Sequence, residues 1–154
     1  MAVYEVAHSK AGVNTAGTVY WVIRSTVSTR RLQILEIGIE VATAPTNGQD
    51  WRCVRTATLG TATANVAGQP IEISNTLASN GQVVHTWSAN PTIGTVDLRR
   101  LGLPATQGSS LIWTWPEHRP LEVSDAATGG IALANANASG ATLGSFAMYV
   151  VYRD

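Results

Sequence analysis

The sequence predicts a single antiparallel β-sandwich of the jelly-roll type, with little or no helix. Apolar and β-branched residues alternate with polar ones in many short segments, which is the periodicity of half-buried strands. Glycine, proline and asparagine separate these segments, and Asn47-Gly48 is the clearest turn signal among them. The length of 154 residues suits one domain.

The segment 31–41 has the clearest strand pattern. Its apolar residues from position 35 onward fall on one face of a strand, whereas Glu36 and Glu40 fall on the other. Leu32 and Ile34 add apolar side chains to the second face, which predicts that this end of the strand is covered on both sides. The predicted core of the sandwich contains Leu35, Ile37, Ile39, Val41, Trp113 and Val150.

The remaining segments are assigned from the same alternation and from their β-branched and aromatic residues. In chain order the predicted strands span residues 18–24, 31–41, 51–57, 83–87, 95–100, 111–115, 120–124, 131–135 and 145–152. Residues 69–78 fit either one helical turn or a loop with a short strand. Residues 58–68 and 134–144 are rich in small uncharged residues, and we expect them to be loops that pack against another surface.

Residues 1–12 are predicted to form an extended N-terminal arm, and residues 13–154 the sandwich domain. The arm opens with apolar residues and continues into a flexible stretch of small and polar ones. An extended apolar segment of this kind suits pairing with a neighbouring subunit or another protein. Val3, Tyr4 and Val6 are therefore candidate interface residues.

Charged residues are few and balanced. Lys and Arg number 10, Asp and Glu number 10, and charged residues make up 13% of the chain, against about 25% in an average protein. The absence of a basic excess argues against a nucleic-acid partner, and a neutral chain has little repulsion between its copies. Neither a signal peptide nor an apolar run of membrane-helix length is visible, so we expect synthesis in the cytoplasm and no membrane partner.

The reactive residues predict no enzyme, no cofactor and no metal site. His8, His85 and His118 form no His-x-His pair of the kind that binds metals on a strand. Cys53 is the only cysteine and has no partner for an internal disulfide. Arg52 and Arg55 stand close to Cys53 and could activate its thiol, but a buried, inert cysteine is the favoured interpretation.

The cluster Glu117-His118-Arg119 is the single catalytic constellation that the sequence offers. It lies between Pro116 and Pro120, which end a strand and favour a turn. Neighbouring side chains on a turn point in different directions, so a solvated turn is favoured over an active site.

The five tryptophans raise the possibility of a carbohydrate site. Trp113 and Trp115 share one face of a predicted strand, and together with Trp87 they would form a stacking platform if they were exposed. Paired aromatic residues on a strand more often belong to a core or a subunit interface. The core or interface is the favoured interpretation, with carbohydrate stacking as the alternative.

Arginine supplies nine of the ten basic residues, and Lys10 is the remaining one. Arginine is favoured at protein interfaces because its planar group makes paired hydrogen bonds to carboxylates, although a compositional bias of the genome also enriches it. The adjacent pairs Arg30-Arg31 and Arg99-Arg100 are the candidate interface residues of this type.

Several stretches resemble a known group of small virion proteins. These stretches span residues 1–6, 29–38, 98–105, 111–116 and 149–152. They are similar to parts of the capsid decoration, or cement, proteins of tailed bacteriophages. The resemblance implies a β-rich trimer on the capsid surface, bound to the major capsid protein, with no catalytic residues. A tail or baseplate protein and a carbohydrate-binding, adhesin-like module on the virion are the alternatives.

A homotrimer is the expected assembly. The low charge, the doubly apolar start of the 31–41 strand and the N-terminal arm all favour contacts between copies. The arginine pairs are expected to meet Glu36, Glu40 or Asp97 of the next chain around a three-fold axis.

Overall fold

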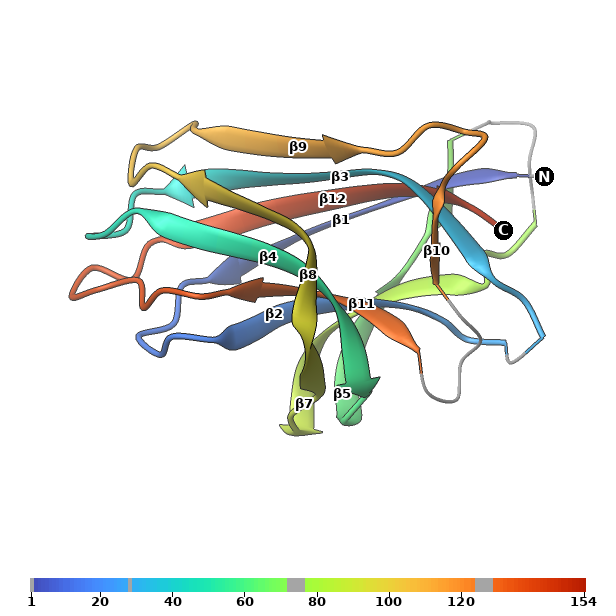
Figure 1. Ribbon diagram of the computed structural model, residues 1–154, viewed down its shortest axis with the longest axis horizontal. Coiled ribbons are helices and arrows are strands. Elements are labelled where there is room, and N and C mark those ends of the chain that lie inside the picture. Colours follow the sequence, from blue (N-terminus) through green and yellow to red (C-terminus); the bar gives the residue numbers. More distant parts are fainter. Residues whose placement is uncertain (1, 28, 72–76, 124–128) are drawn as a thin grey trace.

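The computed structural model describes residues 2–27, 29–71, 77–123 and 129–154, and within these residues the chain is a two-sheet antiparallel sandwich without helix (Figure 1). This confirms the predicted fold class. Its strands are β1 (Val3–Ala11), β2 (Thr18–Ser25), β3 (Leu32–Thr43), β4 (Gln49–Thr58), β5 (Thr61–Ala67), β6 (Gln69–Pro70), β7 (Gly81–Ala89), β8 (Thr92–Leu103), β9 (Ser110–Thr114), β10 (Leu121–Val123), β11 (Gly130–Asn135) and β12 (Ser145–Arg153).

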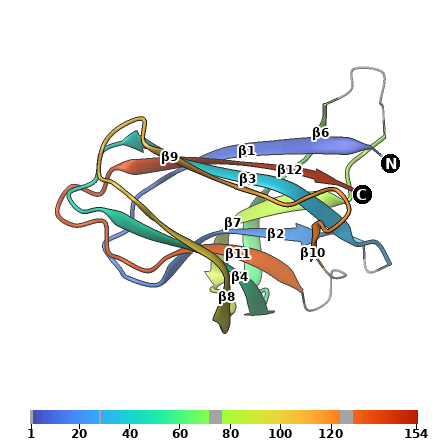
Figure 2. The same cartoon turned by 45° about the horizontal axis from the view of Figure 1, so that its top comes forward.

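The two sheets divide the strands so that the chain passes repeatedly from one layer to the other (Figure 2). The first sheet has the order β10-β3-β12-β1-β6, and β9 pairs with β3 on the edge that β10 also uses. The second sheet has the order β5-β7-β2-β11-β4-β8. This arrangement is compatible with a jelly roll.

The main core lies between the sheets and is rich in aromatic residues. Tyr20, Trp21, Trp51 and Phe146 are fully buried and contact one another, with 4.9 Å between the ring centres of Tyr20 and Trp51. Each such aromatic pair adds about 0.5–1.5 kcal/mol to the effect of burial alone. Strand β12 shows how the sequence produces this layer, because its residues alternate strictly between buried and partly exposed positions.

A β-bulge in β3 corrects the predicted facing of its first half. Ile34 pairs with Tyr152 and Glu36 with Val151, which leaves Leu35 without a partner on β12. Two consecutive residues, Leu35 and Glu36, therefore lie on the outer side of the sheet. Leu35 is outside the core, contrary to the prediction, whereas Leu32 and Ile34 join Ile37 in it. No second covering surface is needed for this end of the strand.

The N-terminal segment is a strand of the first sheet, which corrects the predicted arm and the domain boundary after residue 12. Strand β1 lies between β12 and β6, and its nine pairs with β12 run from Val3–Arg153 to Ala11–Ser145. Tyr4 and Val6 are only 1% and 2% exposed. The apolar character of the segment therefore serves the core of its own chain.

Two short strands lie where the sequence suggested loops. Strand β5 falls in the segment 58–68 and forms an edge of the second sheet. Strand β6 pairs with Tyr4 and Glu5, which favours the short-strand interpretation of residues 69–78 over the helical turn. Residues 72–76 of that segment lie outside the described residues, as does residue 124 at the end of a predicted strand.

The loop of residues 136–144 packs against its own chain rather than another surface. Ser139 is fully buried, its N–H donates to the Val13 carbonyl over 3.1 Å, and its carbonyl accepts from the Thr46 N–H over 3.1 Å. The buried Asn135 side chain donates to the Gln49 side chain at the base of this loop. The loop also contacts the predicted Asn47-Gly48 turn, which connects β3 to β4.

A second, smaller core lies on the other face of the second sheet. Val54, Ala132, Val22 and Val84 form one row across β4, β11, β2 and β7, and all four are buried. Partly buried residues, Trp87 among them, pack against this row. Figure 1 shows the ends of β4, β5, β7 and β8 curving together on one side of the sandwich.

Candidate functional site

The apolar residues predicted for an interface are mostly inside the molecule. Tyr4 and Val6 face the core, and the Tyr4 ring stacks on the Tyr152 ring at 5.8 Å between centres. Val3 is partly buried and pairs with Arg153. Tyr4 and Val6 therefore cannot contact another chain while the sandwich is folded.

Most of the predicted interface arginines have partners within the chain. Arg31 contacts Glu122 over 3.1 Å, Arg99 lies 5.7 Å from the centre of the Trp115 ring, and Arg100 makes three hydrogen bonds to the Asp50 carboxylate. Arg100 also lies 3.7 Å from Asp97 of its own chain, which is one of the carboxylates that it was expected to meet in the next chain. Arg30 is exposed.

The three tryptophans proposed for carbohydrate stacking do not form an exposed platform. Trp113 is only 6% exposed and faces the main core, as predicted. Trp115 is partly buried beside Arg99, and Trp87 packs on the smaller core. Because each ring is covered by its own surroundings, no two of them present adjacent open faces to a sugar.

The segment with Glu117, His118 and Arg119 has the geometry of a turn. The Arg119 N–H donates to the Pro116 carbonyl over 2.9 Å, and all three side chains are exposed. The nearest charged partner of Glu117 is Arg153, at 3.8 Å. The three side chains make no hydrogen bond to one another among the contacts of the described residues.

Cys53 is fully buried in the main core, as the favoured interpretation expected. Burial raises the pKa of its thiol to about 12, and this outweighs the opposing effect of Arg99 and Arg55. The thiolate that a reactive cysteine needs is therefore disfavoured.

The outer face of the first sheet carries the clearest candidate site. Strand register places its outward residues in three rows that cross β1, β12, β3 and β9. The central row is Ala7, Tyr149, Gly38 and Ile112; the rows on either side are Ser9, Ala147, Glu40 and Ser110, and Glu5, Val151, Glu36 and Thr114. We call these three rows the outer face. An uncharged row thus lies between carboxylates on both sides.

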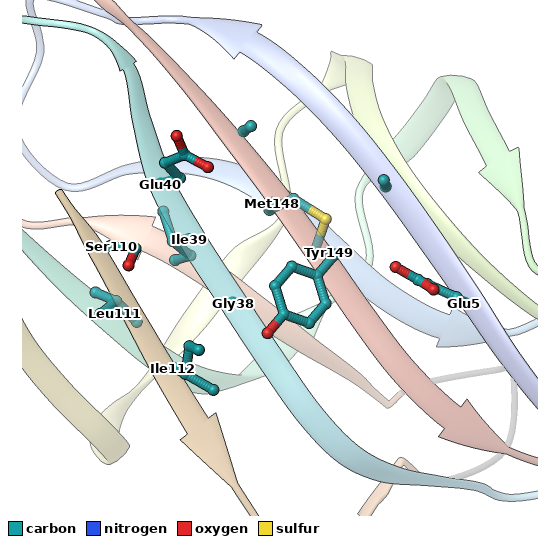
Figure 3. Close-up of a pocket in the computed structure, with 11 residues that line it drawn as sticks. Glu5, Gly38, Ile39, Glu40, Ser110, Leu111, Ile112, Met148 and Tyr149 are labelled. Atoms are coloured by element: carbon teal, nitrogen blue, oxygen red, sulfur yellow. The ribbon is translucent and has the colours of Figure 1, made fainter. Parts of the chain in front are cut away.

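A shallow hollow of about 340 Å³ opens on the outer face (Figure 3). Its lining includes Ala7 and Ala147, whose small side chains leave room for the hollow above β1 and β12. Ile112, which is 55% exposed, also lines it. Figure 3 shows the Tyr149 ring crossing from β12 over β3 at Gly38. A Cβ atom at position 38 would overlap that ring, so glycine is what lets Tyr149 lie flat here.

The electrostatics of the outer face are acidic. The Tyr149 hydroxyl donates to Glu36 over 2.5 Å. This hydrogen bond, with burial and the charges of Glu36 and Glu5, raises the pKa of Tyr149 to about 12. The three rows contain three carboxylates and no lysine or arginine. Among the described residues, no group of three or more His, Cys, Asp or Glu side chains is placed so that it could hold a metal ion.

A second polar cluster joins the two sheets at the β1–β7 side. The rings of His8 and His85 stack with 3.9 Å between their centres. The Trp21 indole N–H donates to Nδ1 of His8 over 3.0 Å, and Lys10 Nζ donates to the His85 carbonyl over 2.6 Å. Burial and the neighbouring cations lower the pKa of His8 and of His85. His85 stands alone in the sequence, and it meets His8 only because the two sheets pack face to face.

The histidine stack predicts that acid destabilises the fold. Well above pH ~6.5 both imidazoles are neutral in the folded and unfolded chains. Below it, the unfolded chain binds protons that the folded chain resists, so the free energy of unfolding falls as the pH falls through the window below the unfolded pKa. Protonation of His8 at Nδ1 also removes the acceptor of the buried Trp21 N–H. We expect the urea midpoint to drop between pH 7.5 and 5.5, starting from about the ordinary histidine pKa.

Two substitutions separate this effect from the general effect of acid on carboxylates. His85→Gln should flatten part of the acid dependence, because it removes one of the stacked imidazoles. His118→Gln is the matched control, since His118 is exposed on a turn and should leave the slope unchanged. Identical slopes for the wild type and His85→Gln would contradict the prediction.

No protein-family model, curated protein or solved structure matches the chain. The resemblance to phage decoration proteins therefore stays a prediction. No helix among the described residues could span a membrane.

The sequence pattern predicted only some of the residues that lie on the outer face. Glu36 and Glu40 were placed together on the polar side of their strand, and the structure agrees. Tyr149 and Ile112 were missed as site residues, because they reach the outer face from distant strands. Their signal was the strict alternation of β12 and β9, which leaves an aromatic and an aliphatic residue on the exposed side.

Proposed function

We propose that this chain is a non-enzymatic structural protein of a phage particle, a head decoration protein that binds the major capsid protein on the outside of the assembled shell and stabilises it. The observation that carries the proposal is the outer face: an open, uncharged row with an exposed isoleucine, bordered by carboxylates, on an antiparallel sheet. Exposed apolar surface with a polar border is typical of protein interfaces.

The proposed assembly is a homotrimer. Three linked copies would strengthen attachment to a symmetric shell through avidity, without requiring tight binding by each copy. Because β1 belongs to its own sheet and Arg31 and Arg100 pair within the chain, the contacts between copies would use other surfaces than those predicted. The low overall charge, with a formal net charge of +0, supports association of copies.

Co-sedimentation with assembled capsid shells tests the proposed function. The wild-type protein should pellet with the shells, and Ile112→Asp should reduce the bound fraction about tenfold by placing a charge in an apolar contact. Val96→Asp is the matched control, because Val96 is 75% exposed on β8 in the other sheet. A wild-type protein that stays in the supernatant would overturn the proposed function. Equal binding of the wild type and Ile112→Asp would instead show that the outer face is not the surface that binds the shell.

A further inference from the structure

We infer that the outer face binds an extended segment of another protein in which two Arg or Lys residues, four positions apart, flank a central apolar residue. This inference deepens the proposed function and rests on it for the use of the outer face as a docking surface. It adds the chemistry of the partner, which the proposed function leaves open.

The spacing of Glu36 and Glu40 on β3 sets the spacing of the basic residues in the partner. Glu36, Gly38 and Glu40 are alternate residues of β3 on the outward side. Two residues four positions apart on a strand lie about 13 Å apart, at ~3.3 Å per residue. A second extended segment has the same repeat, so side chains at its first and fifth positions match Glu36 and Glu40. The side chain at its third position then lies over the central row.

The central row offers an apolar contact at that third position. The hollow of about 340 Å³ is lined by Ala7, Ala147 and Ile112, and Tyr149 lies over Gly38 beside it. An aliphatic side chain would cover the exposed part of Ile112 and lose its own contact with water. A polar side chain would find few hydrogen-bond partners in this row.

The charges of the outer face require a cationic partner. Glu5 and Glu40 are exposed and Glu36 is partly buried, and all three belong to the rows beside the central one. The nearest basic residues along these strands are already engaged. Arg153 donates to Gln33 and to the Glu117 carbonyl, while Lys10 donates to the Tyr20 and His85 carbonyls inside the body. Among the ion pairs of the described residues, none involves Glu5, Glu36 or Glu40, so no ion pair there balances the charge of the outer face.

A second copy of the chain does not supply the required segment. The basic residues of the whole sequence stand at positions 10, 24, 30, 31, 52, 55, 99, 100, 119 and 153, and no two of them are four positions apart. The occupant of the outer face is therefore a different protein.

Peptide binding tests the inference without capsid shells. The probe is a fluorescein-labelled peptide with the sequence Gly-Arg-Thr-Leu-Thr-Arg-Gly, measured by fluorescence anisotropy at low ionic strength. We expect saturable binding that weakens with added salt. Glu40→Gln, which removes a carboxylate from the row beside the hollow, should weaken binding several-fold. Glu117→Gln is the matched control, because Glu117 is exposed on a distant turn, and it should bind as the wild type does.

A rearranged peptide tests the spacing itself. Gly-Arg-Leu-Thr-Thr-Arg-Gly has the same composition and charge, but its leucine points away from the protein when the arginines face Glu36 and Glu40. Weaker binding of this peptide supports the inference. Equal binding of both peptides, no binding of the first, or an equal effect of Glu117→Gln and Glu40→Gln overturns it. Self-association that Ile112→Asp abolishes also overturns it, because the outer face would then be covered by a second copy.

Negative results in the capsid experiment and in the peptide experiment have different meanings. Shell binding that depends on Ile112 without peptide binding retains the proposed function and rejects the partner chemistry. Peptide binding without shell binding retains the docking site and rejects the decoration role.

Discussion

Deletion of residues 1–12 is expected to abolish cooperative folding. Strand β1 supplies nine residue pairs to β12, and Tyr4 and Val6 are buried. Losing two buried side chains of this size removes ~3–6 kcal/mol of apolar burial, against a total stability of ~5–15 kcal/mol for a domain. The deletion also leaves the backbone N–H and C=O groups of β12 that paired with β1 without partners. Urea unfolding followed by tryptophan fluorescence should show no cooperative transition.

A paired substitution on the outward side of the same strand is the control. Glu5 and Ser9 alternate with the buried residues and are exposed, so Glu5→Gln combined with Ser9→Ala should keep the wild-type midpoint within experimental error. A truncated protein that unfolds cooperatively near the wild-type midpoint would show that residues 1–12 are a detachable arm after all.

Local sequence patterns predicted most of the strands because those strands bury one face of large apolar residues. All nine predicted strands correspond to strands of the structure, with β10 described over Leu121–Val123. Strand β5 was missed because its residues are mainly threonine and alanine, whose alternation carries little contrast in hydrophobicity. Strand β1 was recognised as extended, but neither its partner nor its place in the sheet follows from local periodicity.

The candidate site was less predictable than the fold because it depends on register between distant segments. Gly38 lies opposite Tyr149 and Ile112 only once β3 has paired with β12 and β9. The same applies to Arg100, which lies 50 positions from its partner Asp50 and reaches it through the pairing of β4 with β8. A sequence can indicate that arginines seek carboxylates, but the partner depends on the tertiary fold.

The bulge in β3 breaks the strict alternation of inward and outward residues along that strand. A deletion in β3 is therefore expected to have very different effects inside and outside the bulge. Deletion of Gly38 is expected to abolish folding, whereas deletion of Leu35 is expected to be tolerated. Gly38 is paired on both sides, so its loss shifts every preceding residue of the strand to the opposite face. Ile37 would then face solvent and Glu36 the core, where an unpaired charge costs several kcal/mol or more. Far-ultraviolet circular dichroism and urea unfolding should show a loss of cooperative folding.

Deletion of Leu35 differs because it removes the extra residue of the bulge. Ile34 and Glu36 would then follow each other directly opposite Tyr152 and Val151, and Leu32, Ile34 and Ile37 would keep facing the core. The expected cost is one backbone hydrogen bond, since the Leu35 carbonyl accepts from the Trp115 N–H over 2.9 Å, together with a partly buried side chain. A loss of about 1–3 kcal/mol follows, so the variant should still unfold cooperatively at a lower urea midpoint. Equal damage from the two deletions would mean that the facing of Leu32 and Ile34 does not depend on the bulge.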